Sequence, residues 1–158
     1  MDRRELLGVI GAGAGVAVLG QARAADDADR FRYRTRLDKT HLDCLKACEA
    51  CAATCNEGSQ HCLDQLKEHA EHGHGAHHAQ MHRRMMDCQA VCLLVAGMVA
   101  RQSPFLDIMA NACGDTCKRC GDECEKDKSS DEMMKECIRM CRECERTCRD
   151  MARAVTAA

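Results

Sequence analysis

Apolar and polar residues follow each other along most of this chain with the period of an α-helix. Between about residues 38 and 155, cysteine and other apolar residues recur at intervals of three and four, which is the spacing of the buried face of a helix in a bundle. The pattern is interrupted by Gly73 and Gly75, by the pair Ser103 and Pro104, and again near Ser129. It therefore predicts four helices, over about residues 38–70, about residues 78–102, from 103 to about 125, and from 129 to about 155.

Local signals support these boundaries. Ser103 followed by Pro104 is typical of an N-cap and a first helical residue, and Ser129 with Glu132 forms a capping box. Because the connections are short, successive helices are expected to be antiparallel, which predicts an all-α fold, an antiparallel up-down four-helix bundle. The connections after the first and third helices then lie at one end of the bundle. Four apolar residues gather at the other end: Leu37, Leu106, Met151 and Val155.

The buried positions of these helices hold cysteine where a bundle normally has leucine. Fifteen of the 158 residues are cysteine, and the phrase Cys-x3-Cys-x2-Cys-x3-Cys begins at Cys44, Cys113 and Cys137. On a helix the four thiols of one phrase fall in a stripe about 60° wide, so the core is predicted to be lined with cysteine. The candidate metal ligands are Cys44, Cys48, Cys51, Cys55, Cys62, Cys88, Cys92, Cys113, Cys117, Cys120, Cys124, Cys137, Cys141, Cys144 and Cys148.

Several kinds of chemistry use clustered thiols. A disulfide scaffold fits poorly because the number is odd, and because cysteines four apart on one helix are badly oriented for a bridge. Zinc takes four thiolates in a tetrahedron and leaves excess negative charge in a buried core. Cu(I) prefers thiolate and thioether ligands, and one Cu(I) per thiolate neutralises that charge. The sequence therefore favours storage or sequestration of multiple Cu(I) ions, about one per cysteine.

Two other functions stay open at this point. One is a disulfide-stabilised secreted helical interaction module, and the other is a general soft-metal protein that detoxifies zinc or mercury. A thiol redox enzyme would need one cysteine set apart from the rest by its surroundings, and the sequence distinguishes none. The protein is therefore expected not to be an enzyme.

Histidine and methionine supply further candidate ligands. Six of the eight histidines lie between residues 69 and 82, where Gly73 and Gly75 predict a loop. His41 falls on the seam of the first helix, one step before Cys44, where it could cap a copper array. The candidates for copper uptake or auxiliary sites are His41, His69, Met81, Met85 and Met134.

The N-terminal segment has the pattern of an export signal. Arg3 and Arg4 precede a glycine-rich apolar stretch, and Ala22 and Ala24 form a small-x-small cleavage site. Residues 1–25 are therefore expected to be a signal of the twin-arginine type, residues 26–37 a charged arm, and residues 38–158 the cysteine-rich bundle. This predicts an exported protein in the periplasm or elsewhere outside the cytoplasm.

Charge and hydropathy exclude two kinds of partner. The net charge of −2 and the lack of a basic patch interleaved with aromatic residues argue against nucleic acid. No apolar run reaches the 18 or so residues of a membrane span, so no span is expected in the mature chain.

The threefold cysteine phrase within a four-helix bundle resembles the bacterial copper storage proteins. The resemblance covers about residues 38–155, and the leader is similar to that of the exported branch. It implies Cu(I) held by the cysteine thiolates, loading through an open end, and a homo-oligomer that is often a tetramer. It also implies a copper-requiring enzyme or a copper chaperone as a partner. The histidine-rich stretch departs from the plain family pattern.

Overall fold

The computed structural model describes residues 34–68, 75–126 and 131–157. The chain divides into two compact units, residues 1–35 and 36–158. Of the first unit only Arg34 and Thr35 are described, and they begin the 3-10 helix η1 (Arg34–Arg36). The export signal predicted for residues 1–25, and most of the predicted arm, lie outside the described residues.

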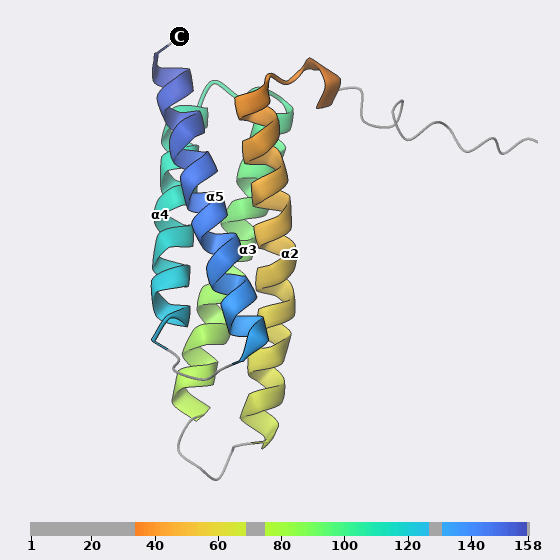
Figure 1. Cartoon of the computed structure of the whole chain (residues 1–158), viewed down its shortest axis with the longest axis vertical. Coiled ribbons are helices and arrows are strands. Elements are labelled where there is room, and N and C mark those ends of the chain that lie inside the picture. The colour runs from red at the N-terminus through yellow and green to blue at the C-terminus, as the bar shows by residue number, and fades with distance from the viewer. Residues whose placement is uncertain (1–33, 69–74, 127–130, 158) are drawn as a thin grey trace, which may run out of the picture. The chain divides into compact units, whose positions relative to one another are not determined.

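The second unit is a bundle of four long helices: α2 (Lys39–Glu68), α3 (Gly75–Ala100), α4 (Leu106–Cys124) and α5 (Glu132–Thr156). They run alternately in opposite directions, so that α2 and α4 end where α3 and α5 begin (Figure 1). Helices α2 and α4 each pack against both α3 and α5. The predicted all-α four-helix bundle is confirmed. No helix in the described ranges is long and apolar enough to cross a membrane.

Aspartate side chains cap two of the helices. The Asp38 carboxylate accepts a hydrogen bond from the backbone N–H of His41 at 2.9 Å, which caps α2. Asp131 is the N-cap of α5, and its carboxylate accepts from the backbone N–H of Met133 at 2.7 Å. The predicted Ser129 lies outside the described residues, and the N-cap that the structure shows for α5 is Asp131.

The turn between α3 and α4 also differs from the prediction. Gln102 has φ 50°, and the next residue, Ser103, donates its backbone N–H to Met98 O at 3.0 Å. This is the Schellman arrangement that ends a helix, so the Ser103 backbone closes α3, while the Ser103 hydroxyl accepts a 3.4 Å hydrogen bond from Phe105 N–H just before α4. Helix α4 begins only at Leu106, with Phe105 at its N-cap position and no side-chain cap.

The histidine-rich stretch is partly helical. Helix α3 already begins at Gly75, three residues before the predicted start, so His77 lies on it together with His78 and His82. The His82 Nδ1–H donates to Ser59 O on α2 at 3.1 Å. Glycine at a helix end is tolerated, and Gly75 therefore does not stop the helix from starting there. His69, His72 and His74 lie outside the described residues.

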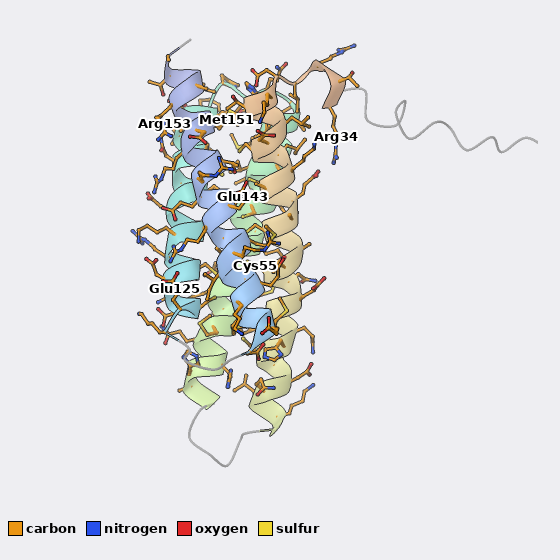
Figure 2. All side chains as sticks on the ribbon, viewed as in Figure 1. Arg34, Cys55, Glu125, Glu143, Met151 and Arg153 are labelled. Carbon is orange, nitrogen blue, oxygen red and sulfur yellow. The ribbon has the colours of Figure 1, made fainter. Side chains whose placement is uncertain are left out.

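The core of the bundle is made of sulfur and a few aliphatic groups. All fifteen cysteines are buried. Cys55 and Met151 lie inside, whereas Glu125 and Arg153 are exposed on the outside (Figure 2). Among the described residues the buried polar ones are Ser59, Ser103 and Thr147, so no buried lysine or arginine is present to balance a thiolate charge.

Candidate metal centre

Thiols from different helices meet in four tight groups. Within each group all four Sγ atoms lie within 4.8 Å of one another. Each group draws on at least three helices, because the seam of every helix faces the bundle axis. The groups are Cys48, Cys113, Cys144 and Cys148; Cys92, Cys113, Cys117 and Cys144; Cys51, Cys88, Cys92 and Cys117; and Cys51, Cys55, Cys88 and Cys141.

Successive groups share thiols. Each group has two cysteines in common with the next one, so the four groups contain only ten different cysteines. The shared pairs, in order along the bundle, are Cys113 with Cys144, Cys92 with Cys117, and Cys51 with Cys88. Four separate tetrahedral zinc sites need sixteen thiolates, which this chain does not have. The arrangement suits a metal whose thiolate ligands bridge neighbouring ions.

The thiols are close but not bonded to one another. The Sγ atoms of Cys92 and Cys117 are 3.5 Å apart, and those of Cys48 and Cys148 are 3.6 Å apart. A disulfide has a sulfur–sulfur distance of about 2.05 Å, and all fifteen cysteines are free. The alternative of a disulfide-stabilised module therefore finds no support in the structure.

Hydrogen bonds between the thiols lower the pKa of some cysteines and raise the pKa of others. Hydrogen bonds from Cys148 and Cys48 lower the pKa of Cys44. Bonds from Cys124, then Cys141 and Cys55, lower the pKa of Cys120. A thiolate that accepts S–H groups is stabilised, while the donors hold their protons more tightly. The pKa of Cys137 is raised to about 12, chiefly by burial.

Five cysteines lie outside the four groups and extend the sulfur core: Cys44, Cys62, Cys120, Cys124 and Cys137. Cys44 Sγ is 3.8 Å from Cys148 Sγ, which continues the array toward the end where α2 begins. Every cysteine predicted as a ligand from the sequence is thus in the core, although their use as ligands stays a prediction.

Methionine sulfur joins the core at the end where α2 stops and α3 begins. Met81, Met85 and Met134 are all buried there. A Cβ placed on Gly58 would lie 2.7 Å from Cys137 Sγ and 2.8 Å from Met85 Sδ. Glycine at position 58 therefore leaves room for these two sulfur atoms.

A histidine that the sequence did not single out for function lies at this same end. His61 Nε2 is 2.6 Å from Asp131 Oδ2, and both side chains are only about a quarter exposed. In the sequence His61 lies off the cysteine seam, and nothing near it indicates a partner. The partner is Asp131, which is the N-cap of α5. Together they tie α2 to the start of α5.

His41 lies at the opposite end, one turn before Cys44. Its Nδ1 is 2.9 Å from Asp38 Oδ2. The hydrogen bond from the His41 backbone lowers the pKa of Asp38, so this carboxylate is charged. A carboxylate on one ring nitrogen is the usual way in which a ligating histidine is oriented. The candidate residues therefore do not gather in one place: His41 is at one end, and the methionines are at the other.

Residues 37–153 match the family described as copper storage protein. The Cu(I)-bound copper storage protein from Bacillus subtilis is 28% identical and has a TM-score of 0.62 over 72% of this chain and 99% of that chain. A cytosolic copper storage protein from Streptomyces lividans with five coppers is 25% identical, with a TM-score of 0.63 over 77% and 96%. A protein from Nitrosospira multiformis is 29% identical, with a TM-score of 0.62 over 75% and 99%. No curated protein matches the chain.

These relatives correct the predicted location. The leader predicted a protein outside the cytoplasm, but the Streptomyces lividans protein is described as cytosolic. The comparison therefore points to the cytoplasm and not to export. The relatives agree with the metal that the thiol chemistry favours, since a second Streptomyces lividans structure is described as loaded with 10 copper equivalents.

Proposed function

The chain belongs to the copper storage protein family, and from this premise we propose that its bundle holds about one Cu(I) ion per cysteine, about fifteen in all, in one connected array. The observation that carries this proposal is the sharing of thiols between successive groups. A bridging thiolate serves two ions, and a two-coordinate ion uses two thiolates, so ions and thiolates are equal in number.

Charge balance favours the same ratio. The described core contains no buried lysine or arginine, and an uncompensated buried thiolate is very unfavourable. Each Cu(I) that binds replaces one thiol proton, so the core stays neutral at every stage of loading. The energetic cost of adding an ion therefore does not accumulate as the array fills.

An anaerobic titration with two metals tests the proposal. The reduced protein should bind Cu(I) until about one ion per thiol is held, and Zn(II) only to about one ion per four thiols. Equal molar capacities for the two metals would contradict the bridged array. The result would also separate copper storage from general soft-metal sequestration.

We propose that copper is taken up at the end that holds Met81, Met85 and Met134. Thioethers bind Cu(I) less tightly than thiolates do, so they suit capture and transfer better than storage. The position of Met85 supports this, because its Sδ and Cys137 Sγ both lie within 3 Å of where a Cβ on Gly58 would be, so a thioether lies near a core thiol at this end. Replacing the three methionines by leucine should slow loading without lowering the final capacity. His69, which lies outside the described residues, is proposed as a further capture site.

We assign His41 to the opposite end of the array as an auxiliary ligand. Its Nδ1 faces the charged Asp38 carboxylate, which leaves Nε2 as the ligating nitrogen. Replacing His41 by phenylalanine, which keeps a planar ring, should remove at most one copper ion per chain. A full loss of copper binding would show that His41 is not an auxiliary ligand.

We propose that the protein forms a homo-oligomer through α3 and the start of α4. Leu93, Leu94, Phe105 and Ile108 are all about half exposed or more, and exposed large apolar side chains are candidates for a contact surface. Replacing Leu93 and Ile108 by aspartate should reduce the mass measured by sedimentation equilibrium. An unchanged mass would mean that these side chains do not form the interface.

The family role is metal sequestration, and we propose that the protein has no catalytic activity of its own. All of its thiols share one buried environment, and none is set apart as a nucleophile with a separate resolving partner. We propose that its copper is exchanged with a copper chaperone or a copper-requiring enzyme. A disulfide-reductase assay should therefore show no turnover above that of a small free thiol.

A further inference from the structure

A pocket of 260 Å³ reaches the thiol core from the side of the bundle, between α3 and α4. Its walls are Arg84, Asp87 and Val91 from α3, and Thr116, Arg119 and Cys120 from α4. Cys120 is 2% exposed, the largest fraction among the fifteen cysteines. The pocket is therefore a lateral approach to a core thiol, separate from both ends of the bundle.

Two arginine side chains, Arg84 and Arg119, bring positive charge to the pocket. Arg84 lies 3.7 Å from Glu123, too far for a hydrogen bond, while Glu123 pairs with Lys126 at 2.9 Å. The Arg84 Nε atom is shielded from solvent and has no hydrogen-bond partner. Two arginines at one pocket suit a carboxylate, which they bind through paired N–H groups. Asp87, on the same wall, suits the ammonium group of an amino-acid ligand.

Cys120 is also connected to the storage array. Its thiol interacts with those of Cys124, Cys141 and Cys55. Cys55 and Cys141 belong to one of the four thiol groups that share members along the bundle. Copper bound at Cys120 would thus be next to the array without crossing either end of the bundle.

We propose that this pocket docks a Cu(I) complex of a small thiol that carries a carboxylate, and that Cys120 takes the copper from it. The inference rests on the storage function proposed above. A Cu–S bond forms to Cys120 while the bond between copper and the carrier sulfur breaks. The proton of Cys120 leaves with the carrier, which departs as a free thiol, and neither copper nor sulfur changes oxidation state.

The test compares two copper donors in anaerobic stopped-flow loading. The donors are the Cu(I) complex of glutathione, which has two carboxylates, and the Cu(I) complex of 2-mercaptoethanol, which has none. The double variant Arg84→Gln/Arg119→Gln should load about tenfold more slowly from glutathione, because rim charges mainly set association rates. Its loading rate from 2-mercaptoethanol and its final capacity should stay within about twofold of the wild type. The matched control is Arg83→Gln/Arg101→Gln, which changes the charge equally at two exposed arginines outside the pocket.

A second variant tests the receiving thiol. Cys120→Ser should lose the advantage of the glutathione donor while its capacity falls by about one ion. Equal loading rates for the wild type and the arginine variant from glutathione would overturn the docking site, as would equal slowing with both donors. Failure of the storage proposal would look different, since the wild type itself would then bind few ions from either donor.

Discussion

Each buried cysteine holds a proton that must leave when copper binds. For Cys137 burial raises the pKa from 9.0 to about 12, so the folded state keeps its proton where the unfolded chain has lost it. Such a thiol stabilises the fold fully below about pH 9, and this stabilisation is lost as the pH rises toward 12. Copper removes the proton altogether and with it the pH dependence.

The melting temperature of the apo-protein should therefore fall between about pH 9 and pH 12, whereas that of the Cu(I)-loaded protein should stay nearly constant. Thermal unfolding followed by circular dichroism under anaerobic conditions measures both. Parallel falls for the two forms would mean that the thiols are not what titrates.

Gly58 is the residue whose replacement should be felt most strongly at the methionine end. A methyl group there would lie within 3 Å of both Cys137 Sγ and Met85 Sδ. Overpacking of this kind costs about 1–3 kcal/mol, against a gain of up to about 1 kcal/mol from helix propensity. Gly58→Ala should thus destabilise the apo-protein and slow copper uptake.

Gly97 offers the matched control for this prediction. It lies on an exposed part of α3, where a Cβ meets only the tip of the flexible Arg101 side chain at 3.4 Å. Gly97→Ala should therefore be neutral or stabilising by up to about 1 kcal/mol in urea unfolding. If the two variants behaved alike, the close packing at Gly58 would not matter.

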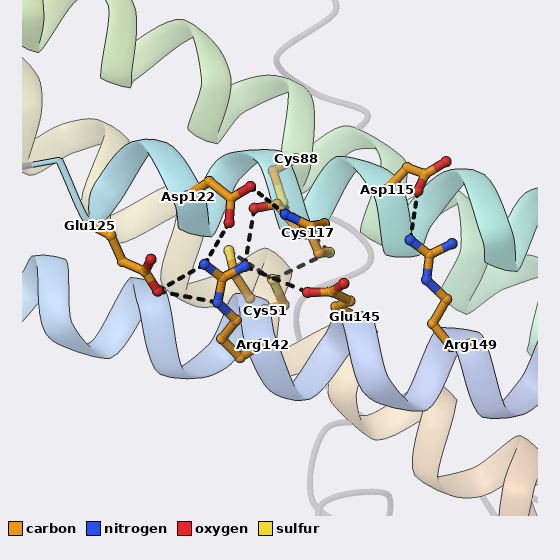
Figure 3. A network of polar contacts seen from close by, with 11 residues as sticks. Cys51, Cys88, Asp115, Cys117, Asp122, Glu125, Arg142, Glu145 and Arg149 are labelled. Atoms are coloured by element: carbon orange, nitrogen blue, oxygen red, sulfur yellow. Dashed lines mark hydrogen bonds and ion pairs between the residues drawn. The ribbon is translucent and has the colours of Figure 1, made fainter.

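At the scale of the elements, arginines hold α5 against α4. Arg142 on α5 bonds Asp122 at 2.6 Å and Glu125 at 2.8 Å on α4, and Arg149 bonds Asp115 at 2.6 Å (Figure 3). A Cβ on Gly121 would approach the Arg142 guanidinium to 3.2 Å. The glycine therefore gives the arginine space to lie across the α4 surface.

Arg142→Gln should lower the free energy of unfolding by about 1 kcal/mol, since a partly exposed guanidinium with several charged partners is worth more than one exposed pair. Arg139→Gln is the control, because the ion pair of Arg139 is with Glu136 on its own helix. That change should cost at most about 0.5 kcal/mol in urea unfolding. Equal losses would show that the contacts between helices add nothing.

The helices could be predicted from the sequence, but not their ends. The seam positions from Met81 to Val99 on α3 are buried as expected, because a narrow stripe can face only one way in a bundle. The caps could not be predicted because several residues near each helix end are able to form them: Asp131 is the N-cap of α5, and the Ser103 backbone N–H closes α3. The contact between His61 and Asp131 depends on how α2 and α5 are rotated about their axes relative to each other. The periodicity of one helix does not predict that rotation.

At the scale of the whole molecule, the shared thiols make the core one connected site. Ten cysteines form four groups, and because each group shares two thiols with the next, all four are linked in one continuous series. The sequence predicted the stripes but not this overlap, because sharing requires thiols from at least three helices at the same level of the bundle. The location outside the cytoplasm was wrong because it rested on the leader alone, and the cytosolic relative contradicts it.

Removing two central thiols should reduce capacity without emptying the core. The double variant Cys117→Ser/Cys141→Ser should bind about two fewer Cu(I) ions per chain and keep its helicity, since the remaining thiolates still bridge. Anaerobic titration against a chromophoric Cu(I) chelator gives the count. Loss of all copper binding would show that the thiols form a single all-or-none cluster and not an array.

The most direct test is a crystal structure of the fully loaded protein with copper located by anomalous scattering. The account predicts a row of Cu(I) ions along the bundle axis, about one for each cysteine, in which shared thiolates such as Cys113, Cys92 and Cys51 each bind two ions. Isolated ions with four unshared thiolates each, or copper confined to surface histidines and methionines, would contradict it.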